Sequence, residues 1–480
     1  MQKLKFTSSD HLYMQVADGI EKMIADEVLQ IGDKLPSVRV LSDEYGISMG
    51  TAFQAYYHLE GKGLIESKPK SGYYVRFNHR RLPGLPKTII AEPIPSEVSV
   101  KDMIASVYKD LSATDIINFS VAVPALELVP AAKLNKSVVY ALRNSKNSCL
   151  GYEHVQGNLD LRKQIARLSF NWGGTVRPDE VVVTTGCMEA LVMCLRAVTK
   201  WGDMVVVEKP AYFGIYQAME SLGLKVVEIS SDSNTGPDLD ELDKILKKFP
   251  VKAVLLVPNF SNPIGSCMPD ENKRKLVNII TKHNIPLIED DIYGELYFGR
   301  NRPKTCKYYD KAQLVMHCSS VSKSLAPGYR VGWVIPGRFL QAVKQLKMMH
   351  TISSPSLTQA AMAHFLEMGR YEYHLKSLRR SLHTQCLRYT QAIMQYFPAD
   401  TKISRPSGGF VLWIELNKKV DAYKLCKEAQ RHHISVAPGQ IFSASSNYSN
   451  YVRISYGAPW SEDVEYGLMM LGRLITKVKM

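Results

Sequence analysis

From about residue 97 to the C-terminus, short apolar runs alternate with longer amphipathic segments. Strands that are buried on both faces of a sheet read as continuous apolar runs, and amphipathic helices between them cover those faces. The pattern therefore predicts an α/β fold built on a mostly parallel sheet. The expected strands are 181–183, 205–207, 226–227, 253–257, 286–288, 314–317 and 331–335.

After about residue 400 the pattern changes to the short strand-like runs 409–415, 435–436 and 452–455, with helical segments between them. This change predicts a smaller α+β subdomain at about 350–480, within a large domain that spans 113–480. The 480 residues are 45% hydrophobic, which suffices for a large core. No apolar run approaches the ~18 residues of a membrane span, so no membrane association is expected.

The first 77 residues have a different organisation. Apolar residues at spacings of three and four predict a helix over 12–28, a second helix fits 37–45, and Ser48 can cap a third that runs to about Leu59. Two short strands around a tight turn follow within 64–75. Helix, helix, turn, helix and hairpin is the order of a winged helix-turn-helix domain, in which the capped third helix enters a DNA groove.

The hairpin region is also basic. Between residues 62 and 81 six lysines and arginines face only Glu66, a local charge of +5 that suits a phosphate backbone. A solvated surface, or a small three-helix domain used for protein contacts, remains an alternative reading of charge and spacing alone. Residues 78–112 form a proline-rich linker and connecting segment, of which 78–96 would reach roughly 60 Å if fully extended.

Several motifs of this region resemble the GntR-type DNA-binding domain, namely Leu35-Pro36-Ser37-x-Arg39, Gly46-Ile47-Ser48 and Ser71-Gly72-x-x-Val75. The resemblance implies DNA contacts by Arg39, Ser48, Met49, Gly50, Thr51, Lys68, Lys70 and Gly72. Met49 stands where family members usually carry an arginine, and Phe53 replaces a residue that is often polar or basic. Loss of an arginine that pairs with guanine should weaken or change base selection.

In the large region, polar residues follow the apolar runs. They form the segments 184–189, 262–265, 289–293 and 319–330. A strand-to-helix turn with glycine points backbone amides at an anion, and acidic residues that end a strand often line a pocket. Each segment alone is also explained by helix capping or by a solvated lysine.

Taken together, these segments resemble pyridoxal-phosphate enzymes of the aspartate aminotransferase fold, fold type I. The resemblance implies that Lys323 forms a Schiff base with the cofactor, that Asp290 pairs with the pyridine nitrogen, and that Tyr212 stacks on the ring. The remaining implied cofactor contacts are Asn262 and Tyr293 to the phenolic oxygen, Tyr152 from a partner subunit, and Gly186, Cys187, Met188, Ser320, Ser322 and Arg330 to the phosphate. Arg453 matches the arginine that binds a substrate α-carboxylate. Met188 and Glu189 depart from the usual residues, so only backbone phosphate contacts are expected there.

A GntR-type head joined to an aminotransferase-like domain resembles the MocR-type transcriptional regulators. The resemblance implies a cytoplasmic homodimer that binds double-stranded DNA, carries pyridoxal 5'-phosphate and senses an amino acid or amine through aldimine formation at Lys323. No metal is expected. An active class I/II-type aminotransferase with a DNA-binding appendage is the alternative, and a protein-binding scaffold is a third reading that leaves Lys323, Asp290 and Arg330 without a purpose.

Overall fold

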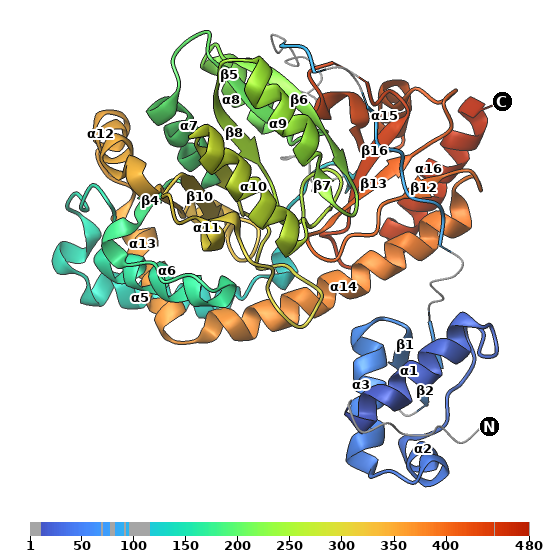
Figure 1. Cartoon of the computed structure of the whole chain (residues 1–480). Helices are drawn as coiled ribbons and strands as arrows, with labels where there is room; N and C mark the ends of the chain where they lie inside the picture. Colours follow the sequence, from blue (N-terminus) through green and yellow to red (C-terminus); the bar gives the residue numbers. More distant parts are fainter. Residues whose placement is uncertain are drawn as a thin grey trace.

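The computed structural model describes residues 11–68, 71–76, 82–90, 93–95, 116–445 and 447–479. The N-terminal head folds as three helices and a hairpin (Figure 1). Its elements are α1 (Leu12–Ala25), α2 (Val38–Tyr45), α3 (Met49–Gly61), β1 (Ile65–Lys68) and β2 (Gly72–Val75). The helices share one apolar core, to which Ile20, Leu41 and Tyr56 contribute. The predicted winged helix-turn-helix is confirmed.

Local signals determine where the head's helices begin. Ser37 Oγ accepts the amide of Val40 at 3.2 Å at the start of α2. Ser48 Oγ accepts the amide of Thr51 at 3.0 Å at the start of α3. Between them Gly46 adopts φ +62°, a left-handed conformation that glycine reaches without steric cost. The turn between α2 and α3 therefore follows directly from these side chains.

The body contains an eight-stranded sheet with the order β4-β11-β10-β9-β8-β5-β6-β7. Its strands are β4 (Val182–Thr184), β5 (Met204–Lys209), β6 (Lys225–Asp232), β7 (Gly236–Pro237), β8 (Val251–Leu256), β9 (Leu287–Asp290), β10 (Val315–Ser320) and β11 (Gly332–Ile335). The central strands β6, β5, β8, β9 and β10 are parallel, whereas β11 is antiparallel to both of its neighbours. The predicted mostly parallel sheet is confirmed.

Helices cover both faces of this sheet. Val205 and Val207 of β5 pack with α7 and α8, whereas Val206 between them packs with α9 and α10 on the opposite face. The helices of this part are α5 (Ala131–Asn144), α6 (Leu159–Leu168), α7 (Cys187–Val198), α8 (Phe213–Ser221), α9 (Leu239–Lys248), α10 (Asp270–His283), α11 (Cys306–Tyr309), α12 (Leu340–His350) and α13 (Ser356–Glu367). Short 3-10 helices lie at Leu126–Leu128, Lys146–Cys149, Ser169–Trp172, Pro178–Glu180, Pro327–Tyr329, Gly337–Phe339 and Gly439–Phe442.

A second, four-stranded sheet forms the C-terminal part, with the order β12-β13-β16-β15. Its elements are β12 (Lys402–Ile403), β13 (Val411–Glu415), α15 (Ala422–Arg431), β15 (Ala437–Pro438), β16 (Tyr451–Ser455) and α16 (Glu462–Lys479). A small parallel pair joins β3 (Ile117–Asn118) to β14 (Ile434–Ser435). The long helix α14 (Arg370–Tyr396) runs beneath both parts of the body (Figure 1).

The head contacts the body mainly along α14. Arg380 of α14 donates a hydrogen bond to the Tyr57 hydroxyl at the end of α3, and its guanidinium lies 5.2 Å from the centre of the Tyr57 ring. Gly63 packs so closely on Leu387 that a Cβ there would lie 1.6 Å from Leu387 Cδ1. Every helix in the described part of the chain is too short or too polar to cross a bilayer.

Candidate functional site

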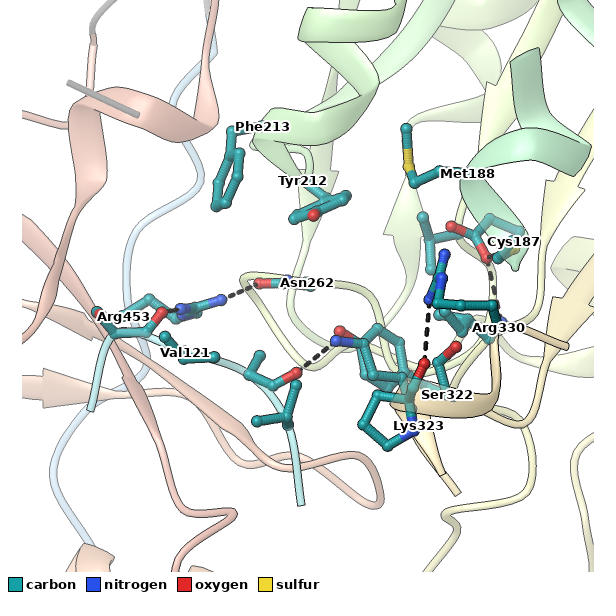
Figure 2. Close-up of a pocket in the computed structure, with 18 residues that line it drawn as sticks. Val121, Cys187, Met188, Tyr212, Phe213, Asn262, Ser322, Lys323, Arg330 and Arg453 are labelled. Carbon is teal, nitrogen blue, oxygen red and sulfur yellow. Dashed lines mark hydrogen bonds between the residues drawn. The ribbon is translucent and has the colours of Figure 1, made fainter. Parts of the chain in front are cut away.

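A cavity of about 340 Å³ opens where the carboxyl ends of the parallel strands meet the C-terminal part of the body (Figure 2). The large sheet and the C-terminal sheet both contribute residues to the cavity, because β9 supplies Asp290 and β16 supplies Arg453. The lining residues are 120–123, Cys187, Met188, Tyr212, Phe213, Val257, Asn262, Asp290, Ile292, Tyr293, Ser322, Lys323, Pro327, Arg330 and Arg453. Ten of the residues predicted from the motifs are among them.

Lys323 follows β10 and reaches into this cavity. Its Nζ donates a hydrogen bond to the carbonyl oxygen of Ala122 at 2.5 Å. The pKa of Lys323 is lowered to about 8, first by burial and then by the positive charge of Arg453. A lysine with this pKa is neutral in a sizeable fraction near neutral pH, and the neutral amine is the form that attacks an aldehyde.

Asp290 ends β9 with its carboxylate buried in the cavity wall. Oδ1 accepts the amide of Ile292 at 3.2 Å and the thiol of Cys187 at 3.3 Å. Burial raises the pKa of Asp290 to about 6, so the carboxylate is mostly ionised at neutral pH. A buried carboxylate of this kind favours a cationic partner such as a protonated ring nitrogen.

An anion-binding corner lies at the start of α7. Gly186 precedes the helix with φ +101°, and a Cβ at this position would lie only 2.3 Å from Nη2 of Arg330. The same Nη2 donates to the carbonyl oxygen of Thr185 at 2.8 Å. Glu189 accepts the Thr185 hydroxyl at 2.6 Å and thereby holds the turn. Helix amides beside an arginine form a phosphate site.

Arg453 lies opposite this corner and is almost completely buried. Its Nη1 donates to Oδ1 of Asn262 at 3.2 Å, and Nη2 donates to the carbonyl oxygen of Ser120. Nε has no hydrogen-bond partner among the described residues. Burial lowers the pKa of Arg453 to about 10, which leaves the side chain cationic at neutral pH. A planar cation with a spare donor suits a carboxylate.

Two tyrosines complete the polar wall. Figure 2 shows Tyr212, at the start of α8, and Lys323 on opposite sides of the cavity. Tyr293 is buried, and a hydrogen bond with Asn262 connects the two side chains. Burial raises the pKa of the Tyr293 phenol, so its hydroxyl remains a hydrogen-bond donor at neutral pH. A flat ring between Tyr212 and Lys323 would therefore meet polar donors at its edge.

Three of the predicted cofactor contacts do not line the cavity. Gly186 lies directly behind it, against Arg330. Ser320 is buried in the wall, where its Oγ accepts the amide of Ser322 at 3.2 Å. Tyr152 lies on the surface with 86% of its area exposed, as a residue that serves a partner subunit would be.

Residues from segment 117–123 form one side of the cavity and were not predicted from the sequence. The carbonyl oxygens of Ser120 and Ala122 accept hydrogen bonds from Arg453 and Lys323. Asn118 holds the segment in a turn because its Oδ1 accepts the amides of Ser120 and Val121. The pairing of β3 with β14 holds this segment at the cavity. The two strands are more than 300 residues apart in the sequence, so no local pattern reveals the segment's role.

In the head, the expected DNA contacts lie on two surfaces. Ser48, Met49, Gly50 and Thr51 occupy the start of α3, where Met49 is 58% exposed, and Arg39 is exposed on α2. Gly72 starts β2 with φ +102°, and Lys68 at the end of β1 lies 4.5 Å from the centre of the Tyr74 ring. Lys70 lies outside the described residues.

Of the described lysines and arginines in the run 62–81, two do not extend from the tip of the hairpin. Lys62 is bound to Glu21 of α1 at 2.6 Å, on the side of the domain formed by α1. Arg76 is largely buried and lies 3.9 Å from Glu66. Among the described cations of this run, Lys68 is therefore the one at the tip of the hairpin.

Comparison with known proteins defines the class of this chain. Residues 114–470 match the family described as "Aminotransferase class I and II", and residues 12–75 match "Bacterial regulatory proteins, gntR family". The chain thus belongs to the aminotransferase class I and II family and carries an N-terminal GntR-type DNA-binding domain, the MocR-type architecture.

Two similar proteins match this chain over both the head and the body. The HTH-type transcriptional regulator YdcR of Escherichia coli K12, described as uncharacterized, is 38% identical over 463 residues, which is 96% of this chain and 98% of YdcR. YjiR of the same organism, also an uncharacterized HTH-type regulator, is 38% identical over 468 residues, with 96% and 98% covered. Among solved structures, the α-aminoadipate aminotransferase LysN of Thermus thermophilus, complexed with N-(5'-phosphopyridoxyl)-L-leucine, has a TM-score of 0.73 and 29% identity. The alignment covers 78% of this chain and 96% of LysN.

The donor set in the cavity fits pyridoxal 5'-phosphate, the cofactor that this fold implies. An amine with a lowered pKa faces the cavity at Lys323. The glycine at 186 lets the guanidinium of Arg330 approach the start of α7, because a Cβ there would collide with it, and helix amides beside an arginine suit a phosphate. The buried Asp290 supplies the negative charge that a pyridinium nitrogen requires.

Proposed function

We propose that the chain is a pyridoxal-phosphate-dependent transcriptional regulator whose affinity for double-stranded DNA is set by an amino acid or amine in the cavity. One observation carries the proposal: a complete cofactor-type cavity and a GntR-type head belong to the same chain and contact each other through α14. Catalysis alone needs no such head. The regulator acts in the cytoplasm, where it has access to DNA.

The cofactor supplies an aldehyde that binds amines reversibly. In this proposal Lys323 would hold that aldehyde, because its lowered pKa supplies the neutral amine that such a bond requires. Asp290 would keep the ring nitrogen protonated, Asn262 and Tyr293 would bind the ring oxygen, and Tyr212 would stack on the ring. The amides of Cys187 and Met188 and the side chains of Ser322 and Arg330 bind the phosphate.

Arg453 selects the ligand in this proposal. Its unpartnered Nε lies in a buried site, and a buried donor without an acceptor is costly unless a ligand provides one. A carboxylate satisfies two donors of a guanidinium at once. The ligand with the highest affinity is accordingly an amino acid with its carboxylate on Arg453.

Helix α14 supplies a physical connection between the cavity and the head. The hydroxyl of Tyr371 lies 2.7 Å from Oγ of Ser324, and Nε2 of His374 lies 2.8 Å from the carbonyl oxygen of Ser324, the residue after Lys323. Further along the same helix, Arg380 binds Tyr57 of α3. A ligand that favours one position of the Lys323 segment would thereby change the position of the head.

The chain between head and body supplies a second connection. Within the predicted linker, the amide of Lys87 donates to Oε2 of Glu415 in the C-terminal sheet at 2.7 Å. The next residue, Thr88, donates to Oδ2 of Asp232 in the large sheet at 3.2 Å. These two contacts attach the segment 87–88 to both parts of the body. A change in the angle between the large sheet and the C-terminal sheet would therefore move this segment.

The regulator is a homodimer in this proposal. Tyr152 is 86% exposed, and Leu150, two residues earlier in the chain, is 89% exposed. In a dimer Tyr152 would reach the phosphate of the partner subunit, as the resemblance implies. Two heads per particle would then bind two half-sites on one duplex.

The test follows two properties in the same titration of cofactor-loaded protein with a panel of amino acids and amines. One is the visible absorbance of the bound cofactor, and the other is the affinity for a DNA duplex obtained by in vitro selection. We expect one ligand class to change both properties over the same concentration range. Steady release of an oxo acid with no change in DNA affinity would support the aminotransferase alternative.

A further inference from the structure

The exposed face of α3 carries apolar side chains. Met49, Phe53 and Tyr57 follow each other at intervals of four residues, and they are 58%, 51% and 50% exposed. We call these three residues the reading stripe. The rings of Phe53 and Tyr57 stack with centroids 6.4 Å apart. The buried face of α3 is formed by Ala52, Ala55, Tyr56 and Leu59, so the head's core does not require the stripe.

No arginine or lysine occurs anywhere in the sequence of α3, residues 49–61. The helix contains one histidine, His58, and the pKa of His58 is lowered chiefly because of burial. Arginine and lysine make the common specific contact with guanine in the major groove. This helix therefore lacks the side chains for that contact, although it lies in the position of the recognition helix.

The stripe matches a different feature of the major groove. The C5 methyl group of thymine is the apolar group that base pairs present there, and phenylalanine is among the side chains that contact it. Gln54, next to Phe53 and also exposed, can bind N6 and N7 of adenine with its amide. The combination of apolar side chains and one amide matches an A·T base pair.

Charges around the stripe favour DNA over a protein as the occupant. Arg39 is exposed on α2, and Nζ of Lys34 and of Lys68 lie 5.9 Å and 4.5 Å from the Tyr74 ring at the hairpin. The start of α3 adds the positive end of the helix dipole. Cations on α2 and on the hairpin, the two elements that pack against α3 together with α1, suit contacts with the phosphate backbone beside a groove.

We propose that Met49, Phe53 and Gln54 select A·T base pairs, with the thymine methyl groups bound by Met49 and Phe53. Tyr57, the third residue of the stripe, contacts Arg380 of the body and is therefore left out of the base contacts. This inference rests on the proposed function, because it names the DNA sequence class that the head binds.

The test begins with selection of random duplexes by the full-length, cofactor-loaded protein. We expect A·T pairs at the centre of each half-site. The selected duplex is then made with deoxyuridine in place of single thymines, which removes the methyl group and preserves base pairing. Each contacted methyl group should contribute about fourfold in affinity, the value for one buried CH₂ group.

Substitutions in the head show which side chain is responsible for the difference in affinity between thymine and deoxyuridine. Phe53→Ala should weaken binding to the thymine duplex and abolish the difference between thymine and deoxyuridine at one position. Leu12→Ala, an exposed apolar residue of α1, is the control and should keep that difference. Both changes are at exposed positions, so the fold is retained.

The outcomes separate the two proposals. Failure to enrich any duplex would overturn the proposed DNA binding and this inference together. Enrichment of G·C-rich duplexes, or equal affinity for thymine and deoxyuridine, would overturn this inference alone. Loss of the dimer in Phe53→Ala with base sensitivity unchanged would also overturn it, because the stripe would then be a protein interface.

Discussion

At the scale of single residues, the proposed role of Lys323 makes its protonation determine how readily the chain takes up its cofactor. Its pKa of about 8 lies below the ordinary lysine value of about 10.4 because the site is buried and positively charged. Raising the pH removes the proton, so the rate of pyridoxal phosphate capture by cofactor-free protein should rise with pH and reach half its maximum near pH 8. Stopped-flow absorbance measures this rate.

The positive charge of Arg453 contributes to the lowered pKa of Lys323, so a variant without that charge tests the cause of the shift. Arg453→Met should move the midpoint of the pH profile upward, because a positive charge that lowers the pKa of Lys323 is lost. Arg338→Met, an exposed site on the same body, should leave the midpoint unchanged. A wild-type midpoint near pH 10 would contradict the burial of Lys323 in this account.

Single residues also show where sequence reasoning succeeds and where it ends. The positions of Lys323, Asp290 and Arg453 in the cavity could be predicted because each lies in a strand or shortly after one, within a recognisable motif. The carbonyl oxygens of Ser120 and Ala122 could not, because a backbone acceptor has no sequence signature and long-range strand pairing brings it to the site. The contact of the Cys187 thiol with Asp290 could not be predicted either, because the two residues are 103 positions apart and meet only through the fold.

At the scale of secondary-structure elements, the hairpin of the head should contact phosphates through Lys68. Lys68→Ala should weaken binding to all duplexes alike and lower the slope of log affinity against log salt by about 1. Lys62→Ala is the matched control, because Lys62 is bound to Glu21 of α1. Equal effects of the two changes on the salt slope would contradict the placement of DNA at the hairpin.

Helix α14 is the element that should transmit the ligand signal. Tyr371→Phe removes its hydrogen bond with Ser324, with a cost of about 1 kcal/mol in unfolding free energy. The change should reduce the ligand-induced change in DNA affinity and leave the affinity without ligand the same. DNA titrations by fluorescence anisotropy measure both quantities.

The control for this prediction lies on the same helix. Tyr373→Phe alters an exposed residue, 72% of whose area is accessible, and should preserve the full response. If Tyr371→Phe also preserves the full response, the signal does not pass through the contact between α14 and Ser324. The linker contacts of Lys87 and Thr88, or the contacts of Arg300 with Tyr13 and Met14 of α1, would then carry the signal.

Elements that depend on interactions between residues close in sequence could be predicted, and elements that depend on distant segments could not. The start of α3 could be predicted because the Ser48 side chain caps its own helix. The strands of the large sheet could be predicted because burial on both faces requires continuous apolar runs. The course of α14 along both parts of the body depends on tertiary packing with distant segments, which periodicity does not encode.

At the scale of the whole molecule, the proposed dimer should share its sites between subunits. Tyr152→Phe and Lys323→Ala should each impair the cofactor sites of a homodimer. In a mixed dimer of the two variants, one site combines an intact Lys323 with the partner's intact Tyr152. Co-expression with two affinity tags should therefore restore tight cofactor binding to half of the sites, measured as cofactor retained per dimer.

The mixed dimer also tests the oligomeric state itself. No restoration in purified mixed dimers would mean that Tyr152 does not serve the neighbouring site, and a monomer in analytical ultracentrifugation would contradict the dimer. The bounds 1–77, 78–112 and 113–480 of the three parts stay predictions at this scale.

Occupation of the Lys323 cavity should change how the head binds DNA, and this coupling is what makes the chain a regulator in the proposed function. The most direct measurement compares DNA affinity with and without the ligand in three proteins: wild type, Lys323→Ala, and Lys311→Ala as an exposed lysine control. The account predicts a change of about fivefold or more in the wild type and in the control, and none in Lys323→Ala. An undiminished response in Lys323→Ala would contradict it.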